Sequence, residues 1–345
     1  MNRSRQPAKR VTQSDVARAA GVSTITVSRV ARGAHSVEAR TRERVSNVIR
    51  ELGYSPHNSA SALAGARSDR ICLLHMDRST DSLGRILIGV IEESSRLGVQ
   101  MVTAGVESMN ADHSRTVRGL VADGAVGAIL APPLGESRPL LTALQSAGIP
   151  VVAIAPGAAR EDIMCVGIDE HGAAYEMTRH LLERGNRCIA FIKGHPGRSA
   201  SNERWRGFAA AVRDSGIDSD RIAVEQGQCT YRSGVEATKR LLDTSHAPTA
   251  IFASSGDMAV GAAAAAYHRG LDVPRALTVV GFDDYHAAGA LWPDITTIRQ
   301  PLTEMATEAV SMLIHTIRSG SDGRQGCCRK KLVGHHLQVT SSEAV

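Results

Sequence analysis

A short stretch near the N-terminus carries side chains that are suited to reading DNA bases. The spacing of apolar residues predicts a helix from Thr24 to about Arg32. Thr24, Ile25, Ser28 and Arg29 lie at the exposed start of this helix. A helix in the major groove contacts base edges with its N-terminal residues, so this stretch predicts a sequence-reading surface.

The residues before this helix predict the element that positions it. Thr12 is suited to cap a first helix, and Asp15 stands where a capping box returns the hydrogen bond. Gly21 then permits a left-handed turn, and Ser23 caps the second helix. With a third helix expected over residues 38–52, the pattern predicts an all-α helix-turn-helix head.

Charge separates this head from the rest of the chain. Residues 1–70 contain 13 Lys and Arg against 5 Asp and Glu, whereas the whole chain has a net charge of +5. The remaining residues therefore carry a small net negative charge. A basic excess confined to one end indicates a phosphate-binding surface on double-stranded DNA, joined to a module with another task.

Composition excludes several other classes of protein. The basic N-terminus has no apolar segment behind it, and no run is long enough to span a membrane, so a cytoplasmic protein is expected. The six cysteines lack metal-ligand and redox spacing, which favours reduced thiols and no metal site. The sequence shows no nucleophile elbow, phosphate loop or dinucleotide fingerprint in a supporting context. We therefore expect no catalytic residues, no cofactor and no enzyme activity.

The body of the chain alternates short aliphatic runs with amphipathic helices. This rhythm predicts an α/β body with parallel sheets, and its restart near Asp169 predicts two lobes. The expected strands are Ile71–Leu74, Gln100–Thr103, Ala128–Leu130, Val151–Ile154, Cys188–Ile192, Ile222–Val224, Ala250–Ala253, Thr278–Val280 and, last, about Lys331–Val339. Ligands bind beyond the carboxyl ends of such strands, so Asp77 and Ser79, which follow the first strand, are expected at the mouth of the cleft between the lobes.

Several stretches together resemble the lactose/galactose repressor family over essentially the full length. In the head they are Val11-Thr12-Gln13-Ser14-Asp15-Val16-Ala17, Ala20-Gly21-Val22-Ser23, Thr26-Val27-Ser28-Arg29-Val30, Thr41-Arg42-Glu43-Arg44-Val45 and Leu52-Gly53-Tyr54-Ser55-Pro56. In the body they are Glu203-Arg204-Trp205-Arg206-Gly207-Phe208, Val280-Gly281-Phe282-Asp283-Asp284 and Ile295-Thr296-Thr297-Ile298-Arg299-Gln300-Pro301.

The resemblance implies a homodimer on a pseudo-palindromic operator. Residues 59–66 would form a hinge helix in the minor groove, with Leu63 wedged into a base step. A helix this short is marginal alone, so its folding can be coupled to DNA binding. The resemblance assigns DNA contacts to Thr12, Ser23, Thr24, Ile25, Thr26, Ser28, Arg29, Tyr54, His57, Asn58, Ala60 and Leu63. His57 stands where the family usually has asparagine.

The resemblance also implies a small-molecule effector, such as a sugar or sugar derivative, in the cleft. Arg204 and Asp283 stand at the positions that hold effector hydroxyls or carboxylates, with Gln300 nearby at a crossover. Gly256 replaces an asparagine common in sugar-responsive members, with Ser255 before it and Asp257 retained after it. Ala155 similarly replaces a polar residue. Both departures argue against a simple galactoside ligand.

These features predict a transcriptional repressor with a type I periplasmic-binding-protein-like body. The expected domains are a head over residues 1–57, a hinge over 58–69 and a body over 70–345. Lobe one would comprise about 70–167 and 299–322, and lobe two about 168–298 and 323–345. The alternative is a periplasmic-type solute-binding protein, which would share the body but lack the basic head. Whether a ligand releases or tightens DNA binding is left open.

Overall fold

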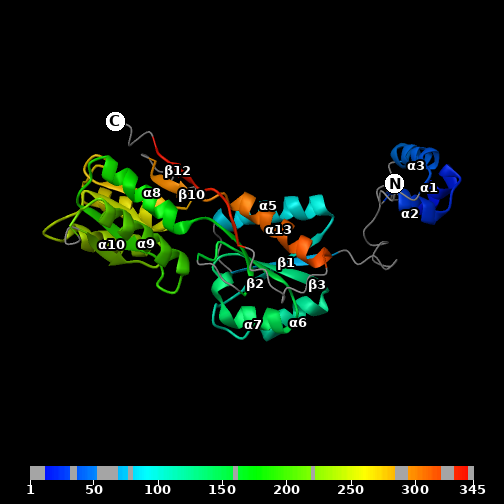
Figure 1. Ribbon diagram of the computed structural model, residues 1–345, viewed down its shortest axis with the longest axis horizontal. Coiled ribbons are helices and arrows are strands. Elements are labelled where there is room, and N and C mark those ends of the chain that lie inside the picture. Colours follow the sequence, from blue (N-terminus) through cyan, green and yellow to red (C-terminus); the bar gives the residue numbers. More distant parts are fainter. Residues whose placement is uncertain are drawn as a thin grey trace, which may run out of the picture. The chain divides into compact units, whose positions relative to one another are not determined.

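The computed structural model describes residues 12–31, 37–52, 69–76, 81–157, 162–218, 222–283, 294–319 and 330–340. It divides into two compact units, Met1–Ser68 and Asp69–Val345. Figure 1 shows both units with their elements labelled. In the part of the chain described, no helix is both long and apolar enough to cross a membrane.

The described part of the first unit contains three short helices. They are α1 (Gln13–Ala20), α2 (Thr24–Ala31) and α3 (Ala39–Glu51). The expected capping box is confirmed, because the Asp15 amide donates to the Thr12 hydroxyl and the Thr12 amide donates to the Asp15 carboxylate. Gly21 ends α1 with a φ of 64°, as the turn requires. The helices pack on a small aliphatic core of Val16, Ala17, Ala20, Val27, Val30 and Val45.

Within its described residues, the second unit has two six-stranded sheets, which define two lobes (Figure 1). The first sheet has the order β11-β5-β4-β3-β1-β2 and is parallel throughout. Its strands are β1 (Arg70–Met76), β2 (Gln100–Val106), β3 (Ala125–Leu130), β4 (Val151–Ile154), β5 (Met164–Gly167) and β11 (Lys330–Leu332). Its helices are α5 (Asp81–Leu97), α6 (Ser114–Ala122), the 3-10 helix η1 (Leu134–Glu136), α7 (Arg138–Ser146) and α13 (Leu302–Arg318).

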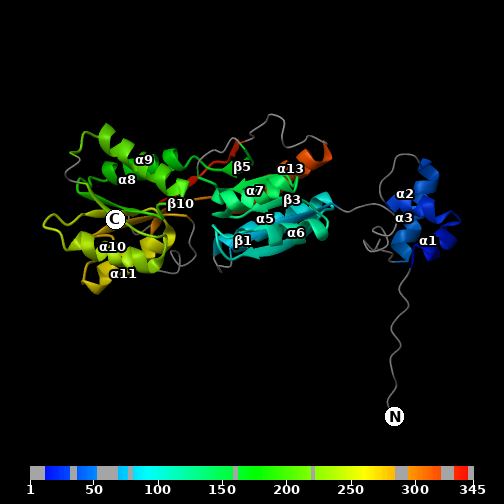
Figure 2. The same cartoon turned by 90° about the horizontal axis from the view of Figure 1, so that it is seen from below.

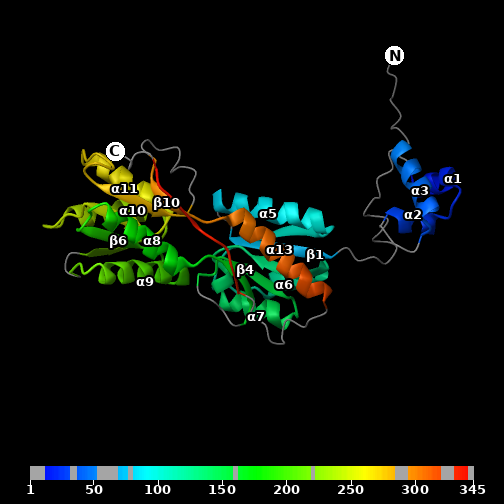
Figure 3. The same ribbon diagram turned by 45° about the horizontal axis from the view of Figure 1, so that its top comes forward.

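Strand β1 shows why this sheet lies between two helical layers. Ile71 and Leu73 belong to the apolar cluster that includes α5 and α13, whereas Cys72 and Leu74 belong to the cluster that includes α6 and α7. Because both faces of the strand are buried, it is apolar along its length instead of alternating. Figure 3 shows α13, from near the C-terminus, lying beside α5 from the start of the body.

The second sheet has the order β12-β10-β9-β8-β6-β7, and only its edge strand β12 runs antiparallel. Its strands are β6 (Ile189–Lys193), β7 (Ala223–Gln226), β8 (Ala250–Ala253), β9 (Thr278–Phe282), β10 (Thr296–Arg299) and β12 (His336–Gln338). Its helices are α8 (Glu170–Glu183), α9 (Ser199–Asp214), α10 (Tyr231–Leu242) and α11 (Gly256–His268). Figure 2 shows α8 and α9 on one side of this sheet and α10 and α11 on the other.

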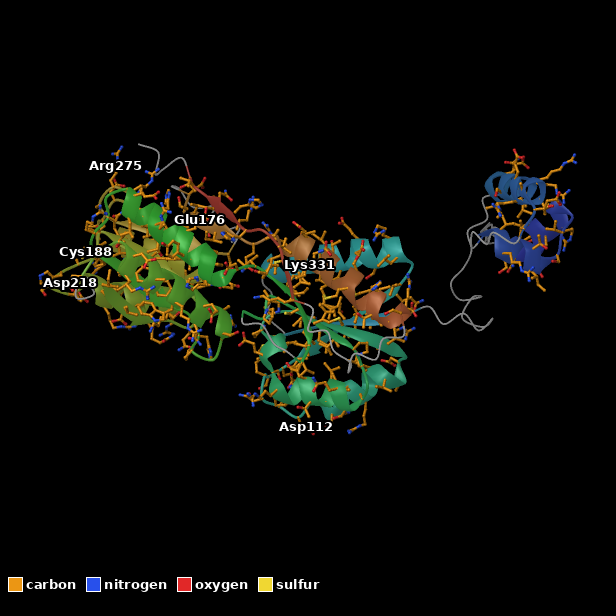
Figure 4. All side chains as sticks on the ribbon, viewed as in Figure 1. Asp112, Glu176, Cys188, Asp218, Arg275 and Lys331 are labelled. Carbon is orange, nitrogen blue, oxygen red and sulfur yellow. The ribbon has the colours of Figure 1, made fainter. Side chains whose placement is uncertain are left out.

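The C-terminal segment differs from the expectation. A single strand was predicted over about Lys331–Val339, and residues 323–345 were assigned to lobe two. Instead, β11 pairs with β5 in the first sheet, and β12 pairs with β10 in the second. The chain therefore crosses between the lobes at residues 333–335. Figure 4 labels Lys331 on the first lobe and Glu176 on the second. Lys331 forms an ion pair with Glu308, and Glu176 is hydrogen-bonded to His335.

The two lobes also touch at the start of α9. The Ser199 amide donates to both carboxylate oxygens of Glu136, each 3.2 Å away. The Ser199 hydroxyl lies 2.7 Å from Glu136 Oε1 and 2.6 Å from the carbonyl oxygen of Pro156. A carboxylate from lobe one thus occupies the positive end of a lobe-two helix. Nearby, Gly157 has a φ of 73°, and a Cβ there would lie 2.1 Å from the Ala200 nitrogen.

Gly157→Ala should therefore lower the free energy of unfolding more than a Gly→Ala change at another left-handed glycine. The left-handed backbone alone costs a non-glycine residue about 1–2 kcal/mol, and the overlap with α9 should add about 1–3 kcal/mol. Gly148→Ala is the matched control, because Gly148 has a φ of 70° with no atom within 4 Å of an added Cβ. Urea unfolding measures both variants. Equal losses would show that the close approach to Ala200 contributes nothing.

Candidate functional site

The exposed start of α2 is the candidate DNA-reading surface. The Ser23 hydroxyl accepts from the Thr26 amide and so caps this helix. Thr24, Ile25 and Arg29 are exposed, with Ile25 64% exposed. Thr26 and Ser28 are half-buried, so they have less surface for contact with a base than expected.

One side-chain contact holds this surface against the start of α1. The Gln13 side chain donates to the carbonyl oxygen of Thr24 at 2.7 Å. Thr12 is exposed and has its hydroxyl in the capping box. The other residues with expected DNA contacts lie outside the described residues: Tyr54, His57, Asn58, Ala60 and Leu63.

The second candidate site lies where three parallel strands of the second sheet end. Ser254 follows β8, Asp283 follows β9 and Gln300 follows β10. Strands β8, β9 and β10 are parallel neighbours, so their carboxyl ends meet at one edge of the sheet. This order brings together Asp283 and Gln300, two of the residues expected to bind an effector, and adds Ser254.

Arg204 of α9 is buried against this edge and is 6% exposed. Its Nε donates to Glu170 Oε2 at 2.7 Å, and Nη1 donates to the Ser254 carbonyl oxygen at 2.7 Å. Nη1 and Nη2 also donate to the two oxygens of Asp283, at 3.3 and 3.2 Å. The guanidinium carbon lies 3.6 Å from the centroid of the Phe282 ring, which covers it with a cation–π contact.

The cluster of Arg204, Glu170 and Asp283 belongs to one lobe. Although burial opposes a charged guanidinium, Asp283 and Glu170 together raise the pKa of Arg204. Burial raises the pKa of Glu170, against the lowering effect of Arg204. Asp283 differs from both, because 32% of its side chain remains exposed. It is therefore the charged member that a ligand can reach most readily.

The backbone presents Asp283 in a special conformation. Its φ is 78°, a left-handed value that aspartate tolerates better than most residues. The Asp283 amide donates to the Ile298 carbonyl oxygen at 2.9 Å, and the Thr297 hydroxyl donates to the Asp283 carbonyl oxygen at 2.9 Å. The Gln300 amide also donates to the Asp283 carboxylate. Residues in and directly after β10 thus fix both the backbone and the side chain of Asp283.

Two buried polar atoms beside the cluster have no hydrogen-bond partner among the described residues. They are Gln300 Oε1 and Ser254 Oγ, in residues that are 6% and 1% exposed. An unpaired buried polar group typically costs about 1–3 kcal/mol. These atoms are therefore positions where a ligand or a water molecule would be stabilised.

A hollow of about 460 Å³ adjoins the cluster through Gln300. Residues of both lobes line it, including Arg85 and Thr303 from the first and Arg299 and His336 from the second. This volume is in the range that holds small molecules.

The other expected effector residues have different positions. Ser255 caps α11, with its hydroxyl accepting from the Met258 amide, and Asp257 lies in the first turn of that helix. Asp77 and Ser79 lie outside the described residues. Glu170 was not anticipated, because nothing in the sequence links it to Arg204, which lies 34 residues further along. In the described part of the chain, no group of three or more His, Cys, Asp or Glu side chains is placed to hold a metal ion.

Comparison with known proteins agrees with both parts of this architecture. Residues 12–57 match the family model described as bacterial regulatory proteins, lacI family, and residues 178–332 match a periplasmic binding protein-like domain. The regulator DegA of Bacillus subtilis is 34% identical over 85% of this chain and 88% of its own length. The regulator CelR of Thermobifida fusca is 34% identical over 92% of this chain and 94% of its own. The chain belongs to the lacI family.

Solved structures of this family match the whole lacI-type architecture. A CelR–cellobiose complex has a TM-score of 0.73 and 32% identity, covering 96% of this chain and all of that one. The Lac repressor dimer bound to operator and an anti-inducer has a TM-score of 0.76 and 26% identity, covering 97% and 99%. The two-lobed body with parallel sheets and the helix-turn-helix head are thus confirmed. A DNA-binding regulator is favoured over a periplasmic solute-binding protein, and the family relatives compared are regulators, not enzymes.

The buried state of Glu170 predicts a pH dependence. A raised pKa means that the folded protein binds this proton more tightly than the unfolded chain, so Glu170 makes stability fall as pH rises above about 4.5. Glu170→Gln removes this pH-dependent loss of stability, because glutamine has no carboxyl group to ionise. The free energy of unfolding of Glu170→Gln should therefore improve relative to wild type as pH rises from 4.5 to 8.

Urea titrations at several pH values measure this difference. Glu183→Gln changes an exposed carboxylate on the same helix and is the matched control. A wild-type advantage that grows with pH would contradict the prediction, because it would mean that Arg204 outweighs burial.

Proposed function

We propose that this protein is a transcriptional repressor that binds a pseudo-palindromic operator as a homodimer. A small sugar-like ligand between the lobes would change its operator affinity. The observation that carries the proposal is the presence, in one chain, of an exposed helix start on a capped head and a buried ion cluster at the strand ends of a two-lobed body. The relatives add support, since the CelR structure holds cellobiose and the Lac repressor dimer is bound to operator.

The head would place the start of α2 in the major groove. Thr24, Ile25 and Arg29 would contact base edges, while the caps Thr12 and Ser23 would contact phosphates through their exposed positions. Thr26 and Ser28 would contribute smaller contacts. The remaining expected contacts would come from the end of the head, with Tyr54 and His57, and from the hinge that follows it, with Asn58, Ala60 and Leu63.

The body would hold the effector at Asp283 and Gln300. A carboxylate accepts hydrogen bonds from paired hydroxyl groups, and Asp283 is the accessible carboxylate of the cluster. Asp77, Ser79, Arg204, Ser255 and Asp257 complete the proposed effector site. Such a protein acts by binding, without catalysis and without a cofactor, in the cytoplasm where operator DNA is found.

Exchanging Thr24 and Ile25 should change the DNA sequence that the protein selects. In the Thr24→Ile, Ile25→Thr double variant, a hydroxyl and an apolar side chain trade places at the helix start, and a wrong base contact costs about 1–3 kcal/mol. Selection from a random DNA library measures the preference, and operator affinity is then compared with and without added sugars.

The wild type should enrich a palindromic site and bind it less tightly at higher salt. An unchanged preference in the double variant would place recognition elsewhere, with Arg29 the next candidate. Failure of the wild type to enrich any sequence would contradict the proposed function.

Leu63→Ala should weaken operator binding by about ten-fold or more while leaving binding to random DNA nearly intact. The physical reason is that a wedge between base steps contributes only where the DNA is bent at the specific site. Fluorescence anisotropy with operator and random duplexes measures both affinities. An equal loss on the two duplexes would argue against a wedge and for a general role in folding.

A further inference from the structure

The body begins at a residue that is held from two sides. Asp69 is the first residue of the second unit, and residues 58–68 of the expected hinge come directly before it. Its carbonyl oxygen accepts a hydrogen bond from the Gln100 amide at 2.9 Å. Its carboxylate Oδ2 lies 3.4 Å from the Nε of Arg318, the last residue of α13. The point where the hinge joins the body is therefore tied to both β2 and α13.

These two contacts together fix the orientation of the Asp69 backbone. The hydrogen bond from Gln100 places the carbonyl group but permits rotation about the Cα–C bond, one of the two soft torsions of a residue. The ion pair with Arg318 places the side chain and so removes that rotation. With the carbonyl group and the side chain both held, the tetrahedral α-carbon leaves one direction for its nitrogen. The hinge is attached at that nitrogen.

The partner of Asp69 is itself held in place. Arg318 also donates from Nη2 to the carbonyl oxygen of Leu97, at the end of α5, with a distance of 3.1 Å. Helix α13 is packed in the core of lobe one, where Val310 and Leu313 are 0% exposed. The guanidinium therefore has a fixed position where the ends of α5 and α13 meet.

We infer that the Asp69–Arg318 ion pair is a positioning device for DNA binding, which fixes the direction in which the hinge leaves the body. The inference rests on the proposed homodimer on a pseudo-palindromic operator. Two heads that share one operator must reach half-sites at a fixed spacing. Binding of the second head is then an intramolecular step, and its effective concentration depends on how the connection is held. Asp69 and Arg318 are positioning residues, since this role requires no contact with DNA.

The experiment compares the full-length wild type with Asp69→Asn, Arg318→Gln and the double variant. Fluorescence anisotropy measures affinity for the palindromic operator and for a duplex of equal length with one half-site. Each single variant should lose about three- to ten-fold in operator affinity and stay within about two-fold on the single half-site, because only the two-headed complex depends on the direction of the hinge. The double variant should lose no more than either single one, since both changes break the same contact.

The two substitutions also separate geometry from charge. Arg318→Gln removes a positive charge and Asp69→Asn a negative one, so a general electrostatic effect would change DNA affinity in opposite directions. Arg240→Gln is the matched control, because Arg240 pairs with Glu225 at exposed fractions of 52% and 27%. The corresponding fractions are 50% for Arg318 and 29% for Asp69. Pairs this exposed contribute little to stability, so urea unfolding should be nearly unchanged in all variants, and the control should bind operator as the wild type does.

The results separate the inference from the function on which it rests. Unchanged operator affinity in both single variants overturns the inference, and so do effects of opposite sign or equal losses on the two duplexes. In these cases the preference of the wild type for operator over the single half-site still stands, and the proposed homodimer stands with it. A wild type that binds both duplexes equally contradicts the proposed function itself, and the inference fails with it.

Discussion

The burial of one guanidinium constrains much of the second lobe. A cation in a low-dielectric interior must have paired and hydrogen-bonded partners, and Arg204 obtains them from Glu170, Ser254 and Asp283. These partners come from α8, β8 and the end of β9, so one side chain on α9 fixes the relation of four elements. Gln300 then extends the network to the end of β10 and to the crossover that leads into α13.

The same helix joins this network to the contact between the lobes. Ser199 donates hydrogen bonds to the carboxylate of Glu136 in lobe one. It precedes Arg204 by five residues, or roughly 7.5 Å along a helix axis. The Arg204–Asp283 ion pair therefore lies close to the contact between the lobes. The Glu136–Ser199 contact and the Arg204–Asp283 ion pair are thus both made by residues of α9.

The elements that could be predicted from the sequence are those whose caps, turns and apolar spacing lie close together in the chain. The head could be predicted because the Thr12 cap, Gly21 and the spacing of valines lie within a few residues of one another. Arg204 and Asp283 were suggested by resemblance to a family. Glu170 and the Glu136–Ser199 contact were missed, since their partners lie 34 and 63 residues away and are brought together only by packing. The C-terminal strand was misassigned because the residues of a short edge strand do not reveal which sheet they will pair with.

Arg204 stabilises the second lobe because it neutralises the buried carboxylate of Glu170 and the partly exposed carboxylate of Asp283. The most direct measurement compares the free energy of unfolding of Arg204→Met with that of the triple variant Arg204→Met, Glu170→Gln, Asp283→Asn. The single variant should lose about 3–5 kcal/mol, since it leaves the buried Glu170 and the partly exposed Asp283 without a cationic partner, and the triple variant should recover most of that loss. A triple variant no more stable than the single one would contradict the account.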